Sequence, residues 1–208
     1  MLSDKHILLG LAFFWFIGQG GSKPAKRKAS PAWTDEEMLI FDGHVKATGV
    51  PTEVALLVYT LESNLDPHAS SGIAWGLPQM TRDTLYNIDW SETGADFGKL
   101  SVADQAPWIE KLLRYQIAVL GGKPPTTALD LFVVNLWPQA ALSKAQVVLD
   151  SNVPKQAAAY KANKGLDRSR PKKGYISRND LASVLSELET SETYMRAIEQ
   201  LRRIHGGT

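Results

Sequence analysis

The sequence predicts a mainly α-helical protein, and three observations support this prediction. Helix-capping residues precede several apolar stretches, one stretch is apolar on almost every side, and no stretch alternates convincingly between apolar and polar residues. The composition is globular: 44% of the 208 residues are hydrophobic, and 23 Lys and Arg stand against 22 Asp and Glu. This length suffices for one domain with a hydrophobic core, and the near-neutral charge argues against a nucleic-acid partner.

The N-terminal part of the chain differs from the rest. Residues 7–18 carry no charge, and at about 1.5 Å per residue they are too short to cross a ~30 Å hydrocarbon core comfortably. We interpret residues 1–18 as a hydrophobic anchor or signal-like segment and residues 19–32 as a basic linker. Most positive charges follow the apolar stretch, which is unusual for a signal peptide, although glycines there permit cleavage. Both interpretations stay open, and residues 33–208 form the folded domain.

The folded domain is expected to start with a helix that runs to about Thr48. Thr34 and Glu37 have the spacing of a capping box, and Trp33 and Met38 have that of a hydrophobic staple. A second helix follows at 54–61, which is apolar almost all round and therefore belongs in the core. Residues 63–80 are rich in small and polar residues and predict a long structured loop. Further helices are expected at 81–87, 102–120, 128–136, 139–149, 154–161 and 178–204.

The residue that indicates chemistry is Glu62, because it ends the most hydrophobic helix and opens the polar loop. Burial raises the pKa of a carboxyl group, and the negative end of a helix dipole acts in the same direction. A carboxyl group that stays protonated near neutral pH is what a general acid needs. The position at the helix end alone favours a solvated surface Glu over a catalytic acid. The sequence of the following loop is therefore needed to choose between the two interpretations. The chain has no cysteine, and its four His form no metal-ligand pair.

The loop after Glu62 carries Glu62-Ser63, Asp66-Pro67, Ser71 and Gly76-Leu77-Pro78-Gln79-Met80. These residues and their spacing resemble the motif of the lytic transglycosylases with the goose-lysozyme-like fold. Later stretches at 105–115, 131–142 and 160–181 are similar to helices and to a late segment of phage-type members. The resemblance covers roughly residues 33–185. It implies a lysozyme-like domain that cleaves peptidoglycan, of bacteriophage or virion origin.

The resemblance also implies roles for individual residues. Glu62 matches the catalytic acid and base, while Ser71, Gln79 and Asn135 match positions that contact the glycan. Trp75 could stack on a sugar, although core packing is as good an interpretation, and the same holds for Trp137. The remaining matches are structural: Ser63 is expected to bond the helix end, Asp66 and Pro67 to brace the loop, and Gly76 with Leu77 to form the turn.

The sequence departs from the family at two places. Val134 stands where the family has a Tyr before its Asn, and Trp137-Pro138 replaces a glycine region. Related phage proteins can carry an acidic calcium loop at 167–174, but Pro171, Lys172 and Lys173 stand there, so no Ca²⁺ site is expected. The resemblance requires no metal and no cofactor.

The resemblance implies a lytic transglycosylase that cuts the MurNAc–GlcNAc β-1,4 bond with one carboxyl group and leaves a 1,6-anhydro product. A hydrolytic muramidase would need a second carboxylate, for which Asp66, Asp83 and Asp89 are the nearest candidates. A non-catalytic glycan-binding or structural virion protein is the third alternative. The expected partners are peptidoglycan strands and, through residues 7–18, a membrane or virion proteins. The expected location is the virion, acting on the host envelope, with export to the periplasm as the alternative.

Overall fold

A computed structural model describes residues 32–207 and confirms that the protein is mainly α-helical. The apolar stretch 7–18 and most of the linker lie outside the described residues. Within residues 32–207, no helix combines the length and the apolar character that a membrane crossing would need.

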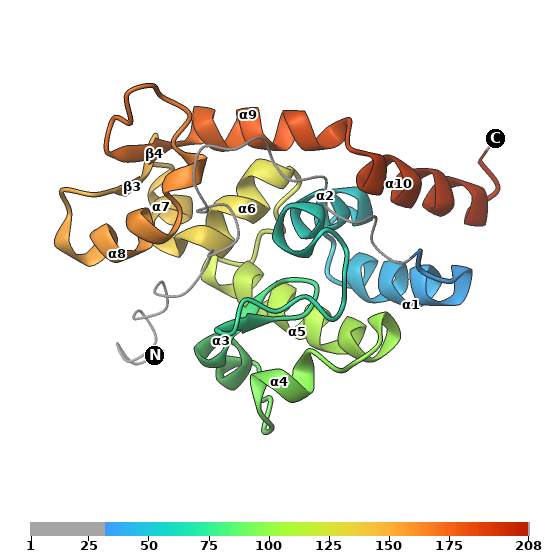
Figure 1. The fold of residues 1–208 in the computed structure, drawn as a ribbon. Coiled ribbons are helices and arrows are strands. Elements are labelled where there is room, and N and C mark those ends of the chain that lie inside the picture. The colour runs from blue at the N-terminus through green and yellow to red at the C-terminus, as the bar shows by residue number, and fades with distance from the viewer. Residues whose placement is uncertain (1–31, 208) are drawn as a thin grey trace.

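The first half of the domain contains five helices and one small hairpin (Figure 1). The helices are α1 (Asp35–Lys46), α2 (Thr52–Ser63), α3 (Arg82–Asn87), α4 (Gly94–Phe97) and α5 (Val102–Val119). The hairpin pairs β1 (Ala74–Trp75) with β2 (Met80–Thr81).

The second half adds five more helices and a second strand pair. The helices are α6 (Ala128–Leu136), α7 (Pro138–Ser143), α8 (Pro154–Ala162), α9 (Arg178–Glu189) and α10 (Glu192–Ile204), and a 3-10 turn spans Lys164–Leu166. Strands β3 (Val147–Asp150) and β4 (Tyr175–Ser177) pair in antiparallel orientation.

Helix α2 lies at the centre of the fold, as its apolar sequence predicted. It packs against α1, α6, α9 and α10, and every residue from Ala55 to Ser63 is buried (Figure 1). A helix that is apolar all round is expected to be buried on all sides. Helix α6 is more apolar than α2 and is likewise buried at every residue from Leu131 to Leu136, so the expectation that α2 is the most hydrophobic helix was wrong. The predicted capping of the first helix is confirmed as well. Thr34 and Glu37 form the capping box, and Trp33 and Met38 are both buried in the core.

The structure contains two short strand pairs, although no stretch of the sequence alternates convincingly between apolar and polar residues. Strands β1 and β2 have two residues each, which is too short for any alternation of apolar and polar residues to show. The helix predicted at 139–149 ends at Ser143, because Lys144 adopts a left-handed conformation with φ 51°. Val147 and the residues after it then pair with β4, a partner that comes later in the chain and leaves no local signal.

The single helix expected at 178–204 is two helices. Helix α9 ends at Glu189, and the Ser191 hydroxyl accepts a hydrogen bond from the Tyr194 amide at 3.4 Å to cap α10. Ser191 is thus the N-cap of a new helix, within a stretch whose sequence otherwise favours one continuous helix. The remaining predicted helices agree with the structure to within one or two residues at each end.

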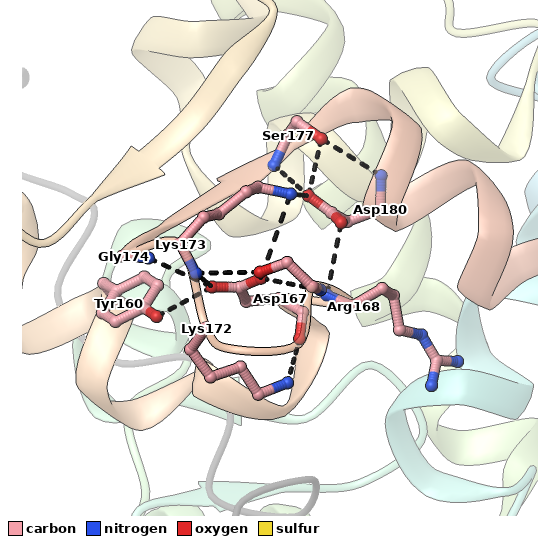
Figure 2. A network of polar contacts seen from close by, with 9 residues as sticks. Tyr160, Asp167, Arg168, Lys172, Lys173, Gly174, Ser177 and Asp180 are labelled. Atoms are coloured by element: carbon pink, nitrogen blue, oxygen red, sulfur yellow. Dashed lines mark hydrogen bonds and ion pairs between the residues drawn. The ribbon is translucent and has the colours of Figure 1, made fainter.

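The loop between α8 and β4 is organised around the buried carboxylate of Asp167 (Figure 2). This carboxylate accepts hydrogen bonds from the backbone amides of Ser169 and Lys173, at 3.0 Å each, and from the Tyr160 hydroxyl at 3.0 Å. The Lys173 ammonium lies 2.6 Å from Asp180 Oδ2 and 3.9 Å from Asp167 Oδ1. The Lys173 ammonium therefore balances the carboxylate of Asp167 in the loop and that of Asp180 in α9.

Asp180 is expected to make the protein sensitive to acid. Hydrogen bonds from Lys173 and Ser177 outweigh the effect of burial and lower its pKa from 3.8 to about 2. The stabilisation from Asp180 is therefore complete above about pH 4 and is lost as the pH falls toward 2; it amounts to roughly 2 kcal/mol. In urea titrations, Asp180→Asn should be less stable than the wild type at pH 6, and this difference should close by pH 2. Asp83→Asn, on an exposed side chain of α3, is the control; an equal deficit of Asp180→Asn at both pH values would contradict the prediction.

Candidate active site

The C-terminal end of α2 presents Glu62 one residue before the helix stops. The helix ends at Ser63 because Asn64 and Leu65 both adopt left-handed conformations, with φ 58° and 59°. The Ser63 hydroxyl donates to the Tyr59 carbonyl at 3.1 Å, which confirms that Ser63 bonds the helix end. Glu62 therefore sits on the rigid core helix, and the chain turns sharply directly after it.

The Glu62 carboxyl group is enclosed and is not compensated by a positive charge. The side chain is 3% exposed, and neither carboxyl oxygen has a partner with full hydrogen-bond geometry. Burial raises the pKa of Glu62 well above its usual value, and the nearby amide of Asn135 offsets this only in part. A carboxyl group in such surroundings holds its proton near neutral pH and can deliver it as a general acid.

Three buried polar side chains are connected with Glu62, either directly or through a neighbour. Asn135 comes from α6, Gln116 from α5, and Tyr59 lies one helical turn before Glu62 on α2. Gln116 Nε2 donates a hydrogen bond to Asn135 Oδ1. Asn135 was predicted, whereas Gln116 and Tyr59 were missed. Tyr59 is a polar group within the apolar run of α2, which was the available signal, and no such signal marks Gln116 on α5. Unpaired polar atoms in a buried region are typical of a functional site.

The negative charge of an ionised Glu62 also acts on Tyr59. Burial, and next the charge on Glu62, raise the pKa of the Tyr59 phenol far above its usual value, so the hydroxyl stays protonated. Its oxygen has no hydrogen-bond partner. Tyr59 thus places a neutral, buried hydroxyl on the same face of α2 as the carboxyl group.

The loop after α2 is held in place by Gln105 of α5, a residue that the sequence analysis missed. Gln105 is fully buried; its Nε2 donates to the Pro67 carbonyl at 2.7 Å, and its Oε1 accepts from the Leu77 amide at 2.9 Å. One side chain thus ties both ends of the motif together. Asp66 braces the loop as predicted, because its Oδ1 accepts from the His68 amide at 2.9 Å.

Gly76 occupies the tightest position of the loop. Its φ is +76°, and a Cβ atom there would lie 2.5 Å from Phe97 Cε1 and 2.6 Å from Gln105 Oε1. The backbone conformation and the close contacts both require glycine, which confirms its predicted structural role.

The side chains predicted to contact glycan occupy different environments. The Gln79 amide is buried and donates to the carbonyls of Ala69, at 3.0 Å, and Gly76, at 2.9 Å, so here it braces the loop. Ser71 is half-buried, and its backbone amide donates to the Ala74 carbonyl at 3.1 Å. Their contact with a substrate stays a prediction.

The two tryptophans considered for sugar stacking pack against the protein. Trp75 lies on the N-terminus of α4, where a Cβ atom on Gly94 would come within 2.1 Å of the indole ring. One ring face is therefore covered by backbone. Trp137 is buried with the core at the junction of α6 and α7. These contacts favour core packing for both.

The other described carboxyl groups with a resolved shift have the opposite character to Glu62. Ammonium, imidazole or hydroxyl partners lower the pKa values of Asp42, Asp96, Glu110, Asp167 and Asp180. Asp83 and Asp89 are exposed, and Asp66 is half-buried. Within residues 32–207, no group of three His, Asp or Glu side chains is arranged to hold a metal ion.

No protein-family model matches this chain, and no curated protein or solved structure matches it either. The features of this chain that bear on its function are therefore the residues around Glu62 and the sequence motif that follows it.

Proposed function

We propose that this protein is a peptidoglycan lytic transglycosylase with a lysozyme-like domain and that Glu62 is its catalytic residue. The observation that carries the proposal is the Glu62 carboxyl group, buried at the end of the core helix with a raised pKa and no cationic partner. The motif resemblance independently selects the same residue. The agreement between a sequence pattern and a perturbed buried acid is typical of a catalytic site.

The proposed reaction uses Glu62 first as an acid and then as a base. Protonated Glu62 donates its proton to the oxygen of the MurNAc–GlcNAc β-1,4 bond, and the bond to C1 of MurNAc breaks. The resulting carboxylate takes the proton from the C6 hydroxyl of the same MurNAc, whose oxygen attacks C1. The products are a free GlcNAc 4-hydroxyl and a 1,6-anhydro-MurNAc end, and Glu62 has regained its proton. The substrate acetamido group supports the positive charge that develops at C1.

The surroundings of Glu62 favour this reaction over hydrolysis. A muramidase of the ordinary type needs a second carboxylate near the bond to act as nucleophile or to activate water. Asp66, the nearest candidate in the chain, is engaged by the His68 amide in the turn that braces the loop. A mechanism in which the substrate supplies the attacking hydroxyl needs only the carboxyl group on α2.

The biological setting belongs to the same proposal and depends on the resemblance alone. A transglycosylase of this type, carried in a phage particle, would open the cell wall locally during infection. Residues 7–18 would then contact a membrane or other virion proteins.

Product analysis tests the proposed reaction. Purified peptidoglycan is digested with the full-length protein and with Glu62→Gln, and the fragments are analysed by mass spectrometry. We expect 1,6-anhydro-muropeptides from the wild type and none from the variant, because the amide cannot transfer a proton. Reducing-end products from the wild type would identify a muramidase instead. Equal inactivity of both proteins, with retained binding to sedimented cell wall, would exclude an enzyme and leave a glycan-binding protein.

A further inference from the structure

A polar contact between α5 and α6 engages one end of the Asn135 amide, and the side chain of Asn135 also acts on Glu62. A side-chain amide has a carbonyl end that only accepts and an NH₂ end that only donates. Gln116 Nε2 donates to Asn135 Oδ1, so the carbonyl end of Asn135 is engaged by α5. The NH₂ end of Asn135 has no hydrogen-bond partner in this structure. The Asn135 side chain nevertheless lowers the pKa of Glu62, in opposition to the effect of burial.

The direction of this amide matters because Glu62 changes charge during the proposed reaction. An ionised carboxylate accepts hydrogen bonds, so an NH₂ group stabilises it, whereas a carbonyl oxygen stabilises only the protonated acid. Gln116 and Asn135 are 6% and 7% exposed, so water does not compete strongly for these groups. If the Asn135 amide turned over, its oxygen would face the carboxylate that forms when Glu62 gives up its proton.

We propose that Gln116 is a positioning residue for Glu62, which acts by holding the Asn135 amide with its NH₂ group toward the carboxyl group. This inference rests on the proposed function, since it assigns Gln116 a part in the same reaction. Asn135 Nδ2 is then in position to donate a hydrogen bond to the carboxylate that Glu62 becomes in the first step. The hydrogen bond forms with full geometry when the carboxyl group ionises, and it requires no rearrangement of the amide at that moment.

Other groups around Glu62 do not supply this function. Tyr59 carries a neutral hydroxyl on the same helix, but its resolved interaction with Glu62 is the charge effect that raises the pKa of the phenol, whereas Asn135 is the side chain whose hydrogen bonding lowers the pKa of Glu62. Among the described residues of α1, α6, α9 and α10, which pack against α2, no charged side chain contributes to the pKa shift of Glu62. The amide of Asn135, oriented from α5, is therefore the group available to stabilise the ionised form.

The test compares Gln116→Met with Asn135→Ala and with the double variant, using rates of anhydro-muropeptide formation by the full-length protein. Gln116→Met keeps the length of the side chain and removes the donor. We expect kcat to fall about 10-fold, with KM changed less than about twofold, because the Asn135 amide no longer points its donor at the carboxylate that forms during the reaction. The basic limb of the kcat profile should move up by about half a pH unit, since the carboxylate loses its donor.

The double variant should be no slower than Asn135→Ala alone, because Gln116 acts through Asn135. Leu113→Met, at another buried position of α5, is the matched control and should keep the wild-type rate and pH profile. Gln116→Glu serves as a second variant if Gln116→Met does not fold. Once ionised, its carboxylate accepts from Asn135 instead of donating, and kcat should fall at least as far.

Two outcomes would overturn the inference. They are a wild-type kcat and pH profile for Gln116→Met in an active enzyme, or fully additive losses in the double variant. Either result leaves the proposed function standing. Absence of anhydro products from the wild type would instead refute the proposed function itself.

Discussion

Glu62→Gln is expected to lower the rate of anhydro-muropeptide formation by about 1000-fold or more, because one group serves as both acid and base. The side chain of Gln has nearly the same size, so the packing around α2 is retained. The loss should appear in kcat, with binding to sedimented peptidoglycan close to that of the wild type. A variant that kept more than about a tenth of the wild-type rate would show that Glu62 is not the catalytic acid.

The same substitution should make the protein more stable at neutral pH. The folded-state pKa of Glu62 is raised, so the folded protein binds a proton more tightly than the unfolded chain. Stability is therefore lost as the pH rises from the unfolded value near 4.5 toward the folded pKa. Gln carries no charge to desolvate, and we expect Glu62→Gln to gain about 1–3 kcal/mol at pH 7.

Urea unfolding at pH 4 and pH 7 measures this effect. The two proteins should have similar stability at pH 4, where Glu62 is protonated in both the folded and the unfolded state. The wild type should be the less stable protein at pH 7. A constant difference at both pH values would mean that burial does not perturb the ionisation of Glu62. A catalytic group that costs stability is a common feature of enzyme sites.

Gly76→Ala is the substitution with the second-largest expected effect. The new methyl group would meet the Phe97 ring and the Gln105 amide at 2.5 and 2.6 Å, and the residue would keep a φ of +76°. We expect a loss of about 3 kcal/mol or more from the clash and the backbone strain together. Activity should fall as well, because displacement of Gln105 releases both Pro67 and Leu77.

Gly72→Ala provides the matched control for this prediction. Gly72 has a similar φ of +84°, but a Cβ atom there meets nothing within 4 Å. The control therefore carries the backbone cost alone, about 1 kcal/mol. Thermal unfolding of both variants separates the two contributions. If both lost the same stability, the close packing around Gly76 would not be what requires a glycine there.

Much of the fold could be predicted from the sequence because its signals are local. The Thr34 cap and the apolar run of α2 each act within a few residues of chain, and the structure has helices at both places. The helix break before Ser191 and the end of α7 were missed. Both depend on one or two residues within patterns that otherwise favour a continuous helix.

The site was predictable in part for the same reason. Glu62, Ser63, Asp66 and Gly76 belong to one short motif, and the structure gives each of them a buried or bracing position consistent with it. The polar groups of α5 were not predictable in this way. Gln105 and Gln116 look like ordinary polar positions on an amphipathic helix, and their partners lie far away in the chain.

The sequence by itself determined that the protein is helical, that α2 is its core, and that Glu62 stands at the end of this helix. Only the tertiary structure decided the surroundings of that carboxyl group. It brought the Asn135 and Gln116 amides from two other helices to Glu62, and it paired β3 with β4. Helix caps and apolar periodicity act between near neighbours in the chain, whereas desolvation and side-chain hydrogen bonds depend on which distant residues the packing brings together.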